Sequence, residues 1–589
     1  MRSTYVDTSN LSGRKVAGTL RRFLLYVVPH RRKVALAFGT LSIAALVNVL
    51  PPWMTMIVVD DFIAEKDAAG AVRIAGALIL VYVSRAILNY INFYLFGRTS
   101  QQIVYEVARD MFHRLVRHSM RFFETQRTGD TISHLTSDVN AVQQAMQGQI
   151  LGAGVGLITL LIYLVVMLTL EWRLTLIIVS VVPLMVLTSM ITARMLRVRY
   201  RRVQESIANI NTAIEENVSG VRVSRAFARE DADTQRFQSE NRENLQANLG
   251  TTTVESVATP LIEGLSALSV AAILGYGGWQ ITLGKMTPGT LVAFLAYLQM
   301  FHQPLTELVR VNYVVQSGLA AADRIFQFMD VRQDIVDAPN ATDLSAPKGE
   351  VEFKQVSFSY DRVTPVLTEV SFVAKAGQTV ALVGSTGSGK TTLVGLIARF
   401  YEPTQGEISI DGKNLNDLRI NSLRSRLAYV PQETFLFSGT IADNVRYGDP
   451  AASDDEVRQA VALASASEFV QELKDGIFTV VGDGGQRLSR GQQQRIALAR
   501  AIVANPTILI LDEATSDIDT ESEYEIQKAL VNVLANRTSF VIAHRLSTIR
   551  NADVILVLED GRIVQRGTHN ELISQQGPYR ELHAAQARI

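Results

Sequence analysis

The first half of the chain is a series of apolar runs, each long enough to cross a membrane, which takes about 20 helical residues. The runs at 34–59 and 150–170 carry no formal charge. The run at 174–193 carries none either but includes Pro183, and the run at 74–96 carries a single charge, Arg85. The pattern predicts six membrane-spanning helices, over residues 34–59, 74–96, 150–170, 174–193, 256–283 and 290–316.

Loop lengths alternate between these runs. The loops after the first, third and fifth runs are short, whereas those after the second and fourth are long, polar and patterned as helices. Five arginines crowd residues 194–202, at the exit of the fourth run. Positive charge near the ends of spans is typical of the cytoplasmic side. We therefore expect a multi-pass protein of the cell (inner) membrane, with the long loops and both termini inside.

The segment before the first run, residues 1–33, has eight basic residues and one acidic residue, Asp7. It lacks the small-residue cleavage site of a signal peptide. We interpret it as an amphipathic lead-in lying on the membrane surface; a solvated basic tail is the alternative.

The pattern changes after residue 320. Residues 321–349 read as a linker, because Pro339, Asn340 and Pro347 interrupt any regular period. Short β-branched strands then alternate with helical stretches from 350 to 589, which is typical of an α/β domain. The predicted order is thus a lead-in (1–33), a six-helix transmembrane domain (34–320), a linker and a nucleotide-binding α/β domain (350–589).

Composition agrees with this division and removes several kinds of function. Mean hydropathy is positive and only 19% of residues are charged, both unusual for a soluble enzyme of this size. The formal net charge of zero gives no general attraction to nucleic acid. Because the chain has no cysteine, disulfides, thiolate metal sites and cysteine nucleophiles are excluded.

A glycine-rich stretch, GSTGSGKT at 384–391, directly follows the apolar strand 379–383 and opens a helix. Glycines let successive backbone N–H groups point at phosphates, and a helix N-terminus adds its positive end. Lys390 would reach the outer phosphates and Thr391 would offer its hydroxyl to Mg²⁺. The predicted ATP-binding residues here are Gly384, Ser385, Thr386, Gly387, Ser388, Gly389, Lys390, Thr391 and Thr392.

A second apolar strand, 507–511, ends on two acids, Asp512 and Glu513. Paired carboxylates at the end of a buried strand are costly without a partner, and a nucleotide-bound Mg²⁺ is a natural one. Asp512 would hold Mg²⁺ through water, and Glu513 would polarise the attacking water. The alternative is an acidic pair capped by nearby amides.

Between these stretches lies LSRGQ at 488–492, at the mouth of a helix. Alone it would read as an ordinary N-cap. Together with the two strand-end motifs it makes the chain resemble the ATP-binding cassette (ABC) family, and in particular bacterial half-transporters of the exporter type (type IV fold). That group contains lipid flippases and multidrug pumps, and the resemblance covers nearly the whole chain.

The resemblance implies roles for further residues. It implies that Tyr360 stacks on adenine, that Gln432 joins Mg²⁺ to the membrane domain, and that His544 senses the γ-phosphate. Glu513 and His544 would be the catalytic residues, with Thr391, Gln432 and Asp512 around the metal. The residues that would complete the ATP site of the opposite subunit are Ser489, Arg490, Gly491, Gln492 and Asp519. Segments 122–130 and 215–222 resemble the family's coupling helices.

Three departures from the family pattern affect surfaces that would face another subunit. Arg490 stands where glycine is usual, the stretch 479–485 lacks the usual Glu-Arg-Gly ending, and Asp517 replaces a small residue. Complete chains of heterodimeric exporters often carry such altered signatures. A homodimer is favoured because every residue needed in cis is present, and a heterodimer remains the alternative.

The function implied is ATP-driven export or flipping of hydrophobic or amphipathic substrates by alternating access in a dimer. ATP would contribute by binding the closed state better than the open one. Peptides or siderophores are alternative substrates, and an ATP-gated channel is a rival function that would not need Glu513 and His544. The six spans exclude a soluble mechanical ATPase.

Ionisable residues inside membrane spans are expensive and often face a cavity. Arg85, Glu263 and His302 are the candidate substrate-cavity residues, and Glu263 lies deepest in its run. Pairing between helices or snorkelling to the interface are the alternatives.

Overall fold

A computed structural model describes residues 13–126, 128–146, 150–331, 334–512, 520–543 and 549–586. The chain divides into two compact units. The helical unit comprises residues 1–116 and 128–331, and the α/β unit comprises residues 332–589 together with 117–127. A short piece of the first long loop therefore belongs with the α/β unit.

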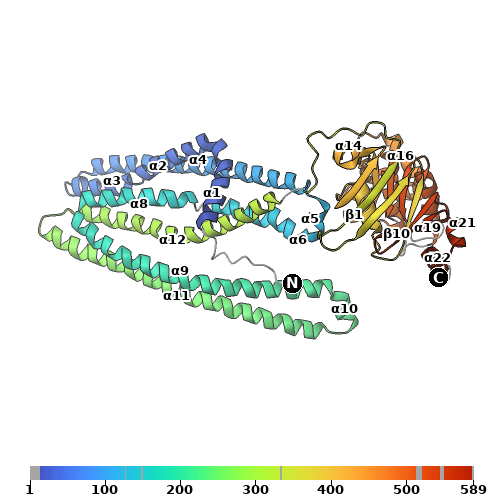
Figure 1. Ribbon diagram of the computed structural model, residues 1–589. Coiled ribbons are helices and arrows are strands. Elements are labelled where there is room, and N and C mark those ends of the chain that lie inside the picture. The colour runs from blue at the N-terminus through green and yellow to red at the C-terminus, as the bar shows by residue number, and fades with distance from the viewer. Residues whose placement is uncertain are drawn as a thin grey trace. The chain divides into compact units, whose positions relative to one another are not determined.

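Among the described residues of the helical unit, four helices are long and apolar enough to cross a membrane, and two shorter apolar helices, Ile158–Leu170 and Pro288–Phe301, accompany them (Figure 1). These six helices coincide with the six predicted spans. The helices of this unit and of its loops are α1 (Gly13–Val27), α2 (Arg31–Val47), α3 (Leu50–Ile57), α4 (Ala68–Leu115), α5 (Met120–Thr125), α6 (Thr128–Ser133), α7 (Val139–Gln144), α8 (Ile150–Leu170), α9 (Trp172–Ser219), α10 (Val221–Ala226), α11 (Glu230–Thr282) and α12 (Pro288–Asp330), with a 3₁₀ turn η2 (Val28–His30) and π-helical turns η3 (Val58–Ile63) and η4 (His134–Asp138).

Four of these helices are much longer than a bilayer is thick. Helices α4 and α9 have 48 residues each, α11 has 53 and α12 has 43. At 1.5 Å per residue they extend over about 65–80 Å, more than twice the roughly 30 Å of a hydrocarbon core. The prediction that the long polar loops are helical is confirmed, because α4, α9 and α11 extend from the spans into these loops and the short helices α5, α6, α7 and α10 make up much of the rest.

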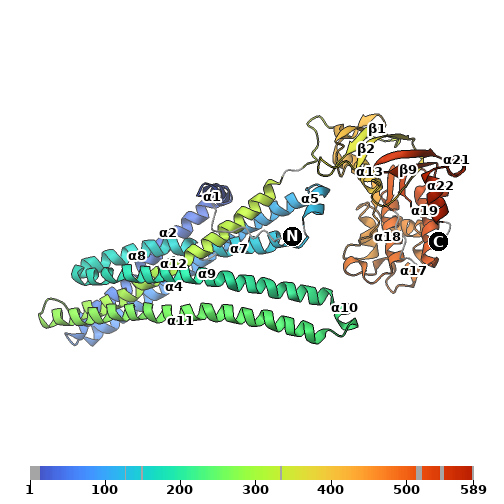
Figure 2. The same cartoon turned by 60° about the horizontal axis from the view of Figure 1, so that its bottom comes forward.

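Helices α9 and α11 pair along their length, and α10 joins their far ends. In both views the far part of this pair extends as an arm away from the other helices of the unit (Figures 1 and 2). The closing turn is held by Ser224, whose hydroxyl donates to Asp233, and by an ion pair between Arg236 and Glu216.

The start of α12 is anchored by an acid from the first short loop. The Asp60 carboxylate accepts hydrogen bonds from the Gly289 amide (2.7 Å) and the Thr287 hydroxyl (2.5 Å), so it neutralises amide groups at the helix N-terminus. The approach is close, since a Cβ at Gly289 would lie 2.4 Å from the Met56 carbonyl oxygen. The first and last spans are thus tied together at this end.

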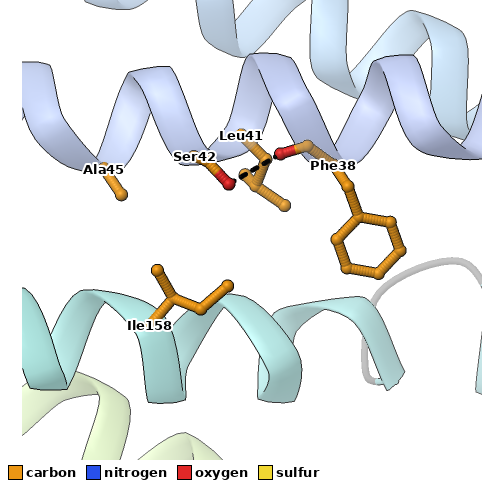
Figure 3. A pocket seen from close by; sticks show the side chains of 5 residues that line it. All are labelled: Phe38, Leu41, Ser42, Ala45 and Ile158. Atoms are coloured by element: carbon orange, nitrogen blue, oxygen red, sulfur yellow. Dashed lines mark hydrogen bonds between the residues drawn. The ribbon is translucent and has the colours of Figure 1, made fainter.

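Helix α2 packs against α8 through small and apolar side chains (Figure 3). Phe38, Leu41 and Ala45 face Ile158 across the two helices. Ser42 lies among them, and its hydroxyl donates to the Phe38 carbonyl oxygen of its own helix at 2.9 Å. No hydroxyl donor is left unsatisfied at this contact, as an apolar environment requires.

The last turns of α12 are held by charged contacts on two sides. The Arg324 guanidinium donates to both carboxylate oxygens of Asp138 (2.6–3.2 Å), and His134 contacts the same carboxylate at 2.7 Å. From α1, the Thr19 hydroxyl donates to Asp323 and Arg22 pairs with Asp330. Helix α1 therefore packs one face on α12 while leucines on its other face stay exposed.

Because the Asp138 side chain is only 8% exposed, its pairing with Arg324 should matter for stability. Removing one partner of a fully buried pair costs about 3–5 kcal/mol, and with Arg324 40% exposed we expect Arg324→Met to cost less, about 2 kcal/mol. The matched control is Arg236→Met, whose pair with Glu216 has both side chains more than half exposed. Apparent melting temperatures of the purified variants test this; equal shifts for the two variants would contradict it.

The α/β unit contains two sheets. A four-stranded antiparallel sheet has the order β2-β1-β4-β5, and a six-stranded sheet has the order β10-β9-β3-β8-β7-β6, in which only the β10–β9 pairing is antiparallel. The strands are β1 (Val351–Phe358), β2 (Leu367–Ala374), β3 (Thr379–Val383), β4 (Gln405–Ile410), β5 (Lys413–Asn414), β6 (Leu427–Val430), β7 (Ile508–Asp512), β8 (Thr538–Ile542), β9 (Val554–Glu559) and β10 (Arg562–Gly567). The helices are α13 (Lys390–Ile397), α14 (Ile420–Arg424), α15 (Ile441–Arg446), α16 (Asp454–Leu463), α17 (Ser467–Glu472), α18 (Arg490–Val503), α19 (Thr520–Leu534), α21 (His569–Ser574) and α22 (Pro578–Gln586), with 3₁₀ turns η6 (Leu415–Asp417), η7 (Gly476–Phe478) and η8 (Asp483–Gly485).

The central strands β3, β7 and β8 of the six-stranded sheet are buried on both faces, as their unbroken apolar sequences predict. Successive residues of a strand point to opposite faces. Val380 and Leu382 therefore join a core with α13 and the smaller sheet, whereas Ala381 and Val383 join a second core with α15, α16, α18 and α19. Helix α13, which follows the glycine-rich loop, is thereby held between the two sheets.

The segment predicted as a linker is more ordered than expected. Its first part, residues 321–330, continues α12, because Ala321, Ile325 and Phe326 are buried. Farther on, Thr342 exchanges backbone hydrogen bonds with Asp417 and Arg419 (2.8 and 2.9 Å). Residues 334–349 thus lie on the α/β unit instead of spanning freely from α12 to β1.

Candidate active site

Three of the predicted motifs lie at one edge of the six-stranded sheet. Strands β3, β8, β7 and β6 are adjacent and parallel, so their carboxyl ends meet at the same edge. The glycine-rich loop follows β3, Asp512 ends β7, and Gln432 comes two residues after β6. In open α/β sheets ligands bind at this edge.

The glycines of the loop are required by close approaches of the backbone. A Cβ at Gly384 would lie 2.2 Å from the Leu558 carbonyl oxygen. Gly389 caps α13 with φ +99°, a conformation that L-residues rarely adopt, and a Cβ there would lie 2.7 Å from Leu367. Ser385, Thr386 and Gly387 form the exposed tip, which leaves their backbone open to a ligand.

Lys390 crosses the inside of this loop. Its ammonium donates to the carbonyl oxygens of Gly384 (2.9 Å) and Ser385 (2.7 Å) and lies 3.4 Å from the buried Ser388 hydroxyl. Burial lowers the pKa of Lys390, and the negative charge of Asp512 opposes that shift. A buried cation whose partners are neutral carbonyl and hydroxyl oxygens is prepared for an anionic ligand.

Asp512 lies at the end of a strand in which every residue is buried. The negative charge of Asp512 affects a neighbouring side chain, Tyr429. The burial of Tyr429 and, to a smaller extent, the charge of Asp512 raise the pKa of Tyr429 to about 12. Thr391 is exposed at the mouth of α13 and Gln432 is exposed beyond β6. A hydroxyl, an amide and a carboxylate are hard oxygen donors, which suit Mg²⁺ held jointly with nucleotide phosphates.

Tyr360 is half-buried beside the first turn of α13. Its hydroxyl lies 3.0 Å from the Thr392 hydroxyl, and its ring packs edge-on against Phe358 and Tyr401 at 4.9 and 5.2 Å. Burial raises the pKa of Tyr360 and keeps the phenol neutral. The ring is therefore fixed close to the residue that follows the phosphate loop.

The LSRGQ motif forms the N-terminus of α18. Ser489 is the N-cap: its hydroxyl accepts from the Gln492 amide (3.3 Å), and the Gln492 side chain accepts from the Ser489 amide (2.9 Å). Gly491 is buried, whereas Ser489 and Arg490 are exposed. The cap and the positive end of a 14-residue helix together present donors outward.

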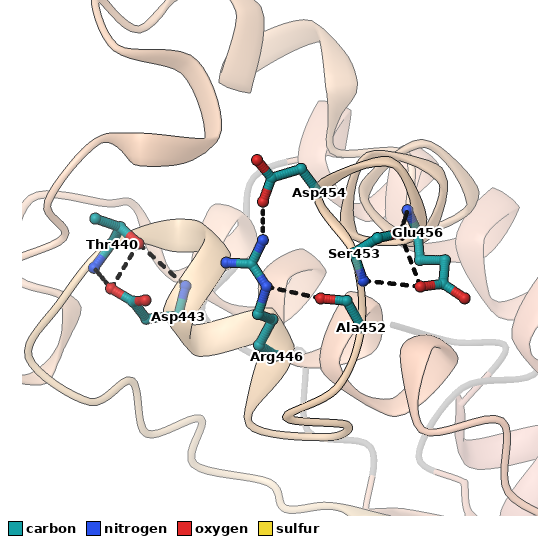
Figure 4. Close-up of polar contacts among 7 residues, drawn as sticks. All are labelled: Thr440, Asp443, Arg446, Ala452, Ser453, Asp454 and Glu456. Carbon is teal, nitrogen blue, oxygen red and sulfur yellow. Dashed lines mark hydrogen bonds and ion pairs between the residues drawn. The ribbon is translucent and has the colours of Figure 1, made fainter.

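Two further capping boxes hold helices α15 and α16, which pack against α18 (Figure 4). The Thr440 hydroxyl and amide hold the pKa of Asp443 below its usual range. The hydrogen bonds from Thr440 to the ionised Asp443 therefore stabilise the folded state. This stabilisation is fully present above the pKa that Asp443 has in the unfolded chain, and it is lost as the pH falls through the lower pKa of the folded state. Between the boxes, Arg446 donates to the Ala452 carbonyl oxygen (2.9 Å) and pairs with Asp454.

Several predicted residues lie outside the described part of the chain. Glu513, Asp519 and His544 are among them, as is Asp517, and the side chain of His302 is too. Of the other candidate cavity residues, Arg85 on α4 is half-buried and Glu263 on α11 is exposed. Their roles and that of the ATP-site set stay predictions.

Two contributors to the site were missed in the sequence. Gln493 donates to the carbonyl oxygens of Gly485 (2.9 Å) and Leu488 (3.1 Å), which orients the chain entering α18. Tyr401 packs against Tyr360. For Gln493, its position directly after the LSRGQ motif was the only feature of the sequence that could have indicated a role. For Tyr401, no neighbouring residue indicates a role.

Comparison with known proteins agrees with this geometry. Residues 34–305 match the ABC transporter transmembrane region, and residues 367–516 match the ABC transporter family model. A solved structure of a bacterial Atm1-family ABC exporter with ATP bound has a TM-score of 0.78 and 30% identity, covering 95% of this chain and 98% of that one.

Curated relatives match over nearly their whole length. An ATP-dependent lipid A-core flippase of Syntrophus aciditrophicus is 37% identical over 566 residues, which is 96% of this chain and 94% of the flippase. The uncharacterized ABC transporter ATP-binding protein YknV of Bacillus subtilis is 37% identical over 567 residues, 96% and 94% of the two chains. The resemblance drawn from the sequence is thus confirmed: the chain belongs to the ABC transporter family, as a membrane protein of the exporter fold that couples ATP hydrolysis to transport.

Proposed function

We propose that this chain flips or exports lipids or other hydrophobic, amphipathic molecules across the inner membrane by alternating access in a dimer. The observation that carries the proposal is its 37% identity with a lipid A-core flippase over 96% of its length. Spans that carry few charges offer a mainly apolar surface, which suits a substrate that is already dissolved in the bilayer. In this orientation the α/β unit and the arm of α9 and α11 lie in the cytoplasm.

The dimer is supported by two exposed features of the chain. Glu263 is exposed in the apolar part of α11, where a carboxylate facing lipid would be costly, so a cavity or a second subunit is the better neighbour. Ser489 and Arg490 are exposed at the start of α18, where a partner's nucleotide can reach them. We favour a homodimer, with a heterodimer as the alternative.

In the proposed ATP site, the amides of the phosphate loop and Lys390 bind the phosphates, and Tyr360 stacks on adenine. Thr391, Gln432 and Asp512 surround Mg²⁺, which would neutralise charge on the transferred phosphoryl group. Glu513 orients and polarises the attacking water, and His544 contacts the γ-phosphate. Ser489, Arg490, Gly491, Gln492 and Asp519 complete the partner's site.

In the membrane, we propose that Arg85, Glu263 and His302 contribute to the substrate cavity. The half-buried guanidinium of Arg85 suits a phosphate or carboxylate headgroup, whereas the surrounding span is apolar. Such a site would hold a lipid by its charged head while its chains stay in the bilayer.

The test is to reconstitute the purified chain alone into vesicles that contain a fluorescent phospholipid and a lipid A-type glycolipid. We expect ATP to increase the fraction of either lipid that becomes inaccessible to a quencher outside, and Lys390→Ala to show no such increase. ATP hydrolysis without lipid movement, but with transport of a hydrophobic dye, would point to drug export. No hydrolysis by the chain alone would overturn the homodimer.

A further inference from the structure

We propose that Glu124, on the short helix α5 of the first long loop, is a positioning residue for the base of the bound nucleotide. It would act through Tyr401, whose hydroxyl it binds and whose ring packs against the ring of Tyr360. The proposal rests on the contact of Tyr360 with adenine, and it makes the base end of the ATP site sensitive to the loop that follows α4.

The loop residues involved belong to the α/β unit. Residues 117–127 cluster with it, whereas residues on both sides of this segment cluster with the helical unit. Within the segment, His118 stacks on Phe122 with ring centres 4.4 Å apart, and the Ser119 hydroxyl donates to Asp334 at 3.4 Å. The segment is thus fixed on the α/β unit, and Glu124 has a defined place there.

Glu124 is joined to the nucleotide site by consecutive contacts. The Tyr401 hydroxyl donates to the Glu124 carboxylate. The Tyr401 ring meets the Tyr360 ring edge-on, with ring centres 5.2 Å apart. Tyr360 in turn lies 3.0 Å from the Thr392 hydroxyl, one residue after the phosphate loop. Glu124 and Tyr401 are 277 residues apart in the chain.

The bond to Glu124 fixes the position of Tyr401. A carboxylate accepts, so the single proton of the Tyr401 hydroxyl is used on Glu124. The Tyr401 ring is thereby held against the Tyr360 ring, and this contact supports Tyr360 in its place beside Thr392.

The phenols stay protonated over the physiological range. Burial, followed by the hydrogen bond and the charge of Glu124, raises the pKa of Tyr401 far above its usual value. Burial also raises the pKa of Tyr360. Removing the Glu124 carboxylate would leave the half-buried Tyr401 hydroxyl without this acceptor.

Coupling of this kind works in both directions. If the position of Glu124 changes the affinity of the site for a nucleotide base, base binding must bias the loop segment by the same free energy.

The test compares a ligand that has a base with one that has none, using the full-length protein in lipid nanodiscs. We would measure KM for ATP and the inhibition constant of inorganic tripolyphosphate, which reaches only the phosphate loop. Glu124→Ala and Tyr401→Phe should each raise KM for ATP about three- to tenfold, the effect of losing about one hydrogen bond. The tripolyphosphate constant should stay within twofold of the wild type, and this also shows that the domain is folded.

Three further variants separate the explanations. Glu124→Gln keeps an acceptor and should be close to wild type. The double variant Glu124→Ala/Tyr401→Phe should have a KM for ATP no higher than that of the more impaired single variant, because both substitutions remove the same hydrogen bond. Tyr579→Phe is the matched control, since it deletes a buried hydroxyl bonded to His569 (2.7 Å) outside the site.

The outcomes distinguish the positioning role of Glu124 from the proposed contact of Tyr360 with adenine. If Tyr360→Ala raises KM for ATP but Glu124→Ala and Tyr401→Phe do not, the positioning role of Glu124 is overturned. If Tyr360→Ala has no effect either, the adenine contact itself fails. Equal losses toward ATP and tripolyphosphate would show general damage to the domain and would also overturn the role proposed for Glu124.

Discussion

Lys390→Ala is expected to reduce ATP hydrolysis at least about a hundredfold, the scale of losing one donor that stabilises developing charge. In the structure the ammonium lies inside the phosphate loop, bonded to two of its carbonyl oxygens. Alanine would remove the buried cation that faces the outer phosphates. The rate of phosphate release by the protein in lipid, at saturating ATP, measures the loss.

Lys528→Ala is the control for this experiment. Lys528 is on α19 of the same domain, is half exposed, and contacts Glu525 and the Tyr524 ring of its own helix. Its replacement should leave turnover within about twofold. Unaltered size-exclusion profiles would show that both variants fold, and Lys390→Ala turnover within tenfold of wild type would contradict the assigned role.

Glu513→Gln is expected to lower turnover about 10²- to 10⁴-fold, the usual contribution of a general base, while ATP binding is kept. Glutamine has nearly the same shape, so the nucleotide contacts can form, but it cannot draw a proton from the attacking water. ATP binding by a fluorescent analogue and phosphate release are the two measurements.

Glu521→Gln provides the comparison for this second variant. Glu521 is an exposed acid in the first turn of α19, eight positions farther along the same stretch of chain. It should hydrolyse ATP like the wild type. If Glu513→Gln retained turnover, the assignment of the catalytic acid would be wrong, and if it lost ATP binding, Glu513 would have a structural role.

The phosphate loop and the sheet around it could be predicted because their signals are local. A strand, the GSTGSGKT stretch and a helix succeed each other within about twenty residues, and the backbone demands glycine where Gly384 meets Leu558. The six spans could be predicted for a similar reason, since a bilayer requires one continuous apolar run per helix.

Other features depend on residues that are distant in the chain. Neither Glu124 nor Tyr401 shows its partner in its own neighbourhood, because the folded chain alone brings them together. The order of residues 321–330 was likewise missed, since their helical burial depends on packing against other helices. If the substrate cavity forms between two subunits, neither a local motif nor the fold of a single chain can predict it.

The anchoring of α12 has a consequence for how the protein is made. Asp60 contacts Gly289 across 229 residues, and Thr19 contacts Asp323 across 304. A ribosome delivers α1, α2 and α3 long before α12 exists, so these groups must wait, solvated by water or headgroups, while the intervening spans insert. Only the arrival of the last span can close the helical unit. A chain stalled before residue 288 should therefore be open to proteases at its first loop and would gain protection in one step when α12 is completed.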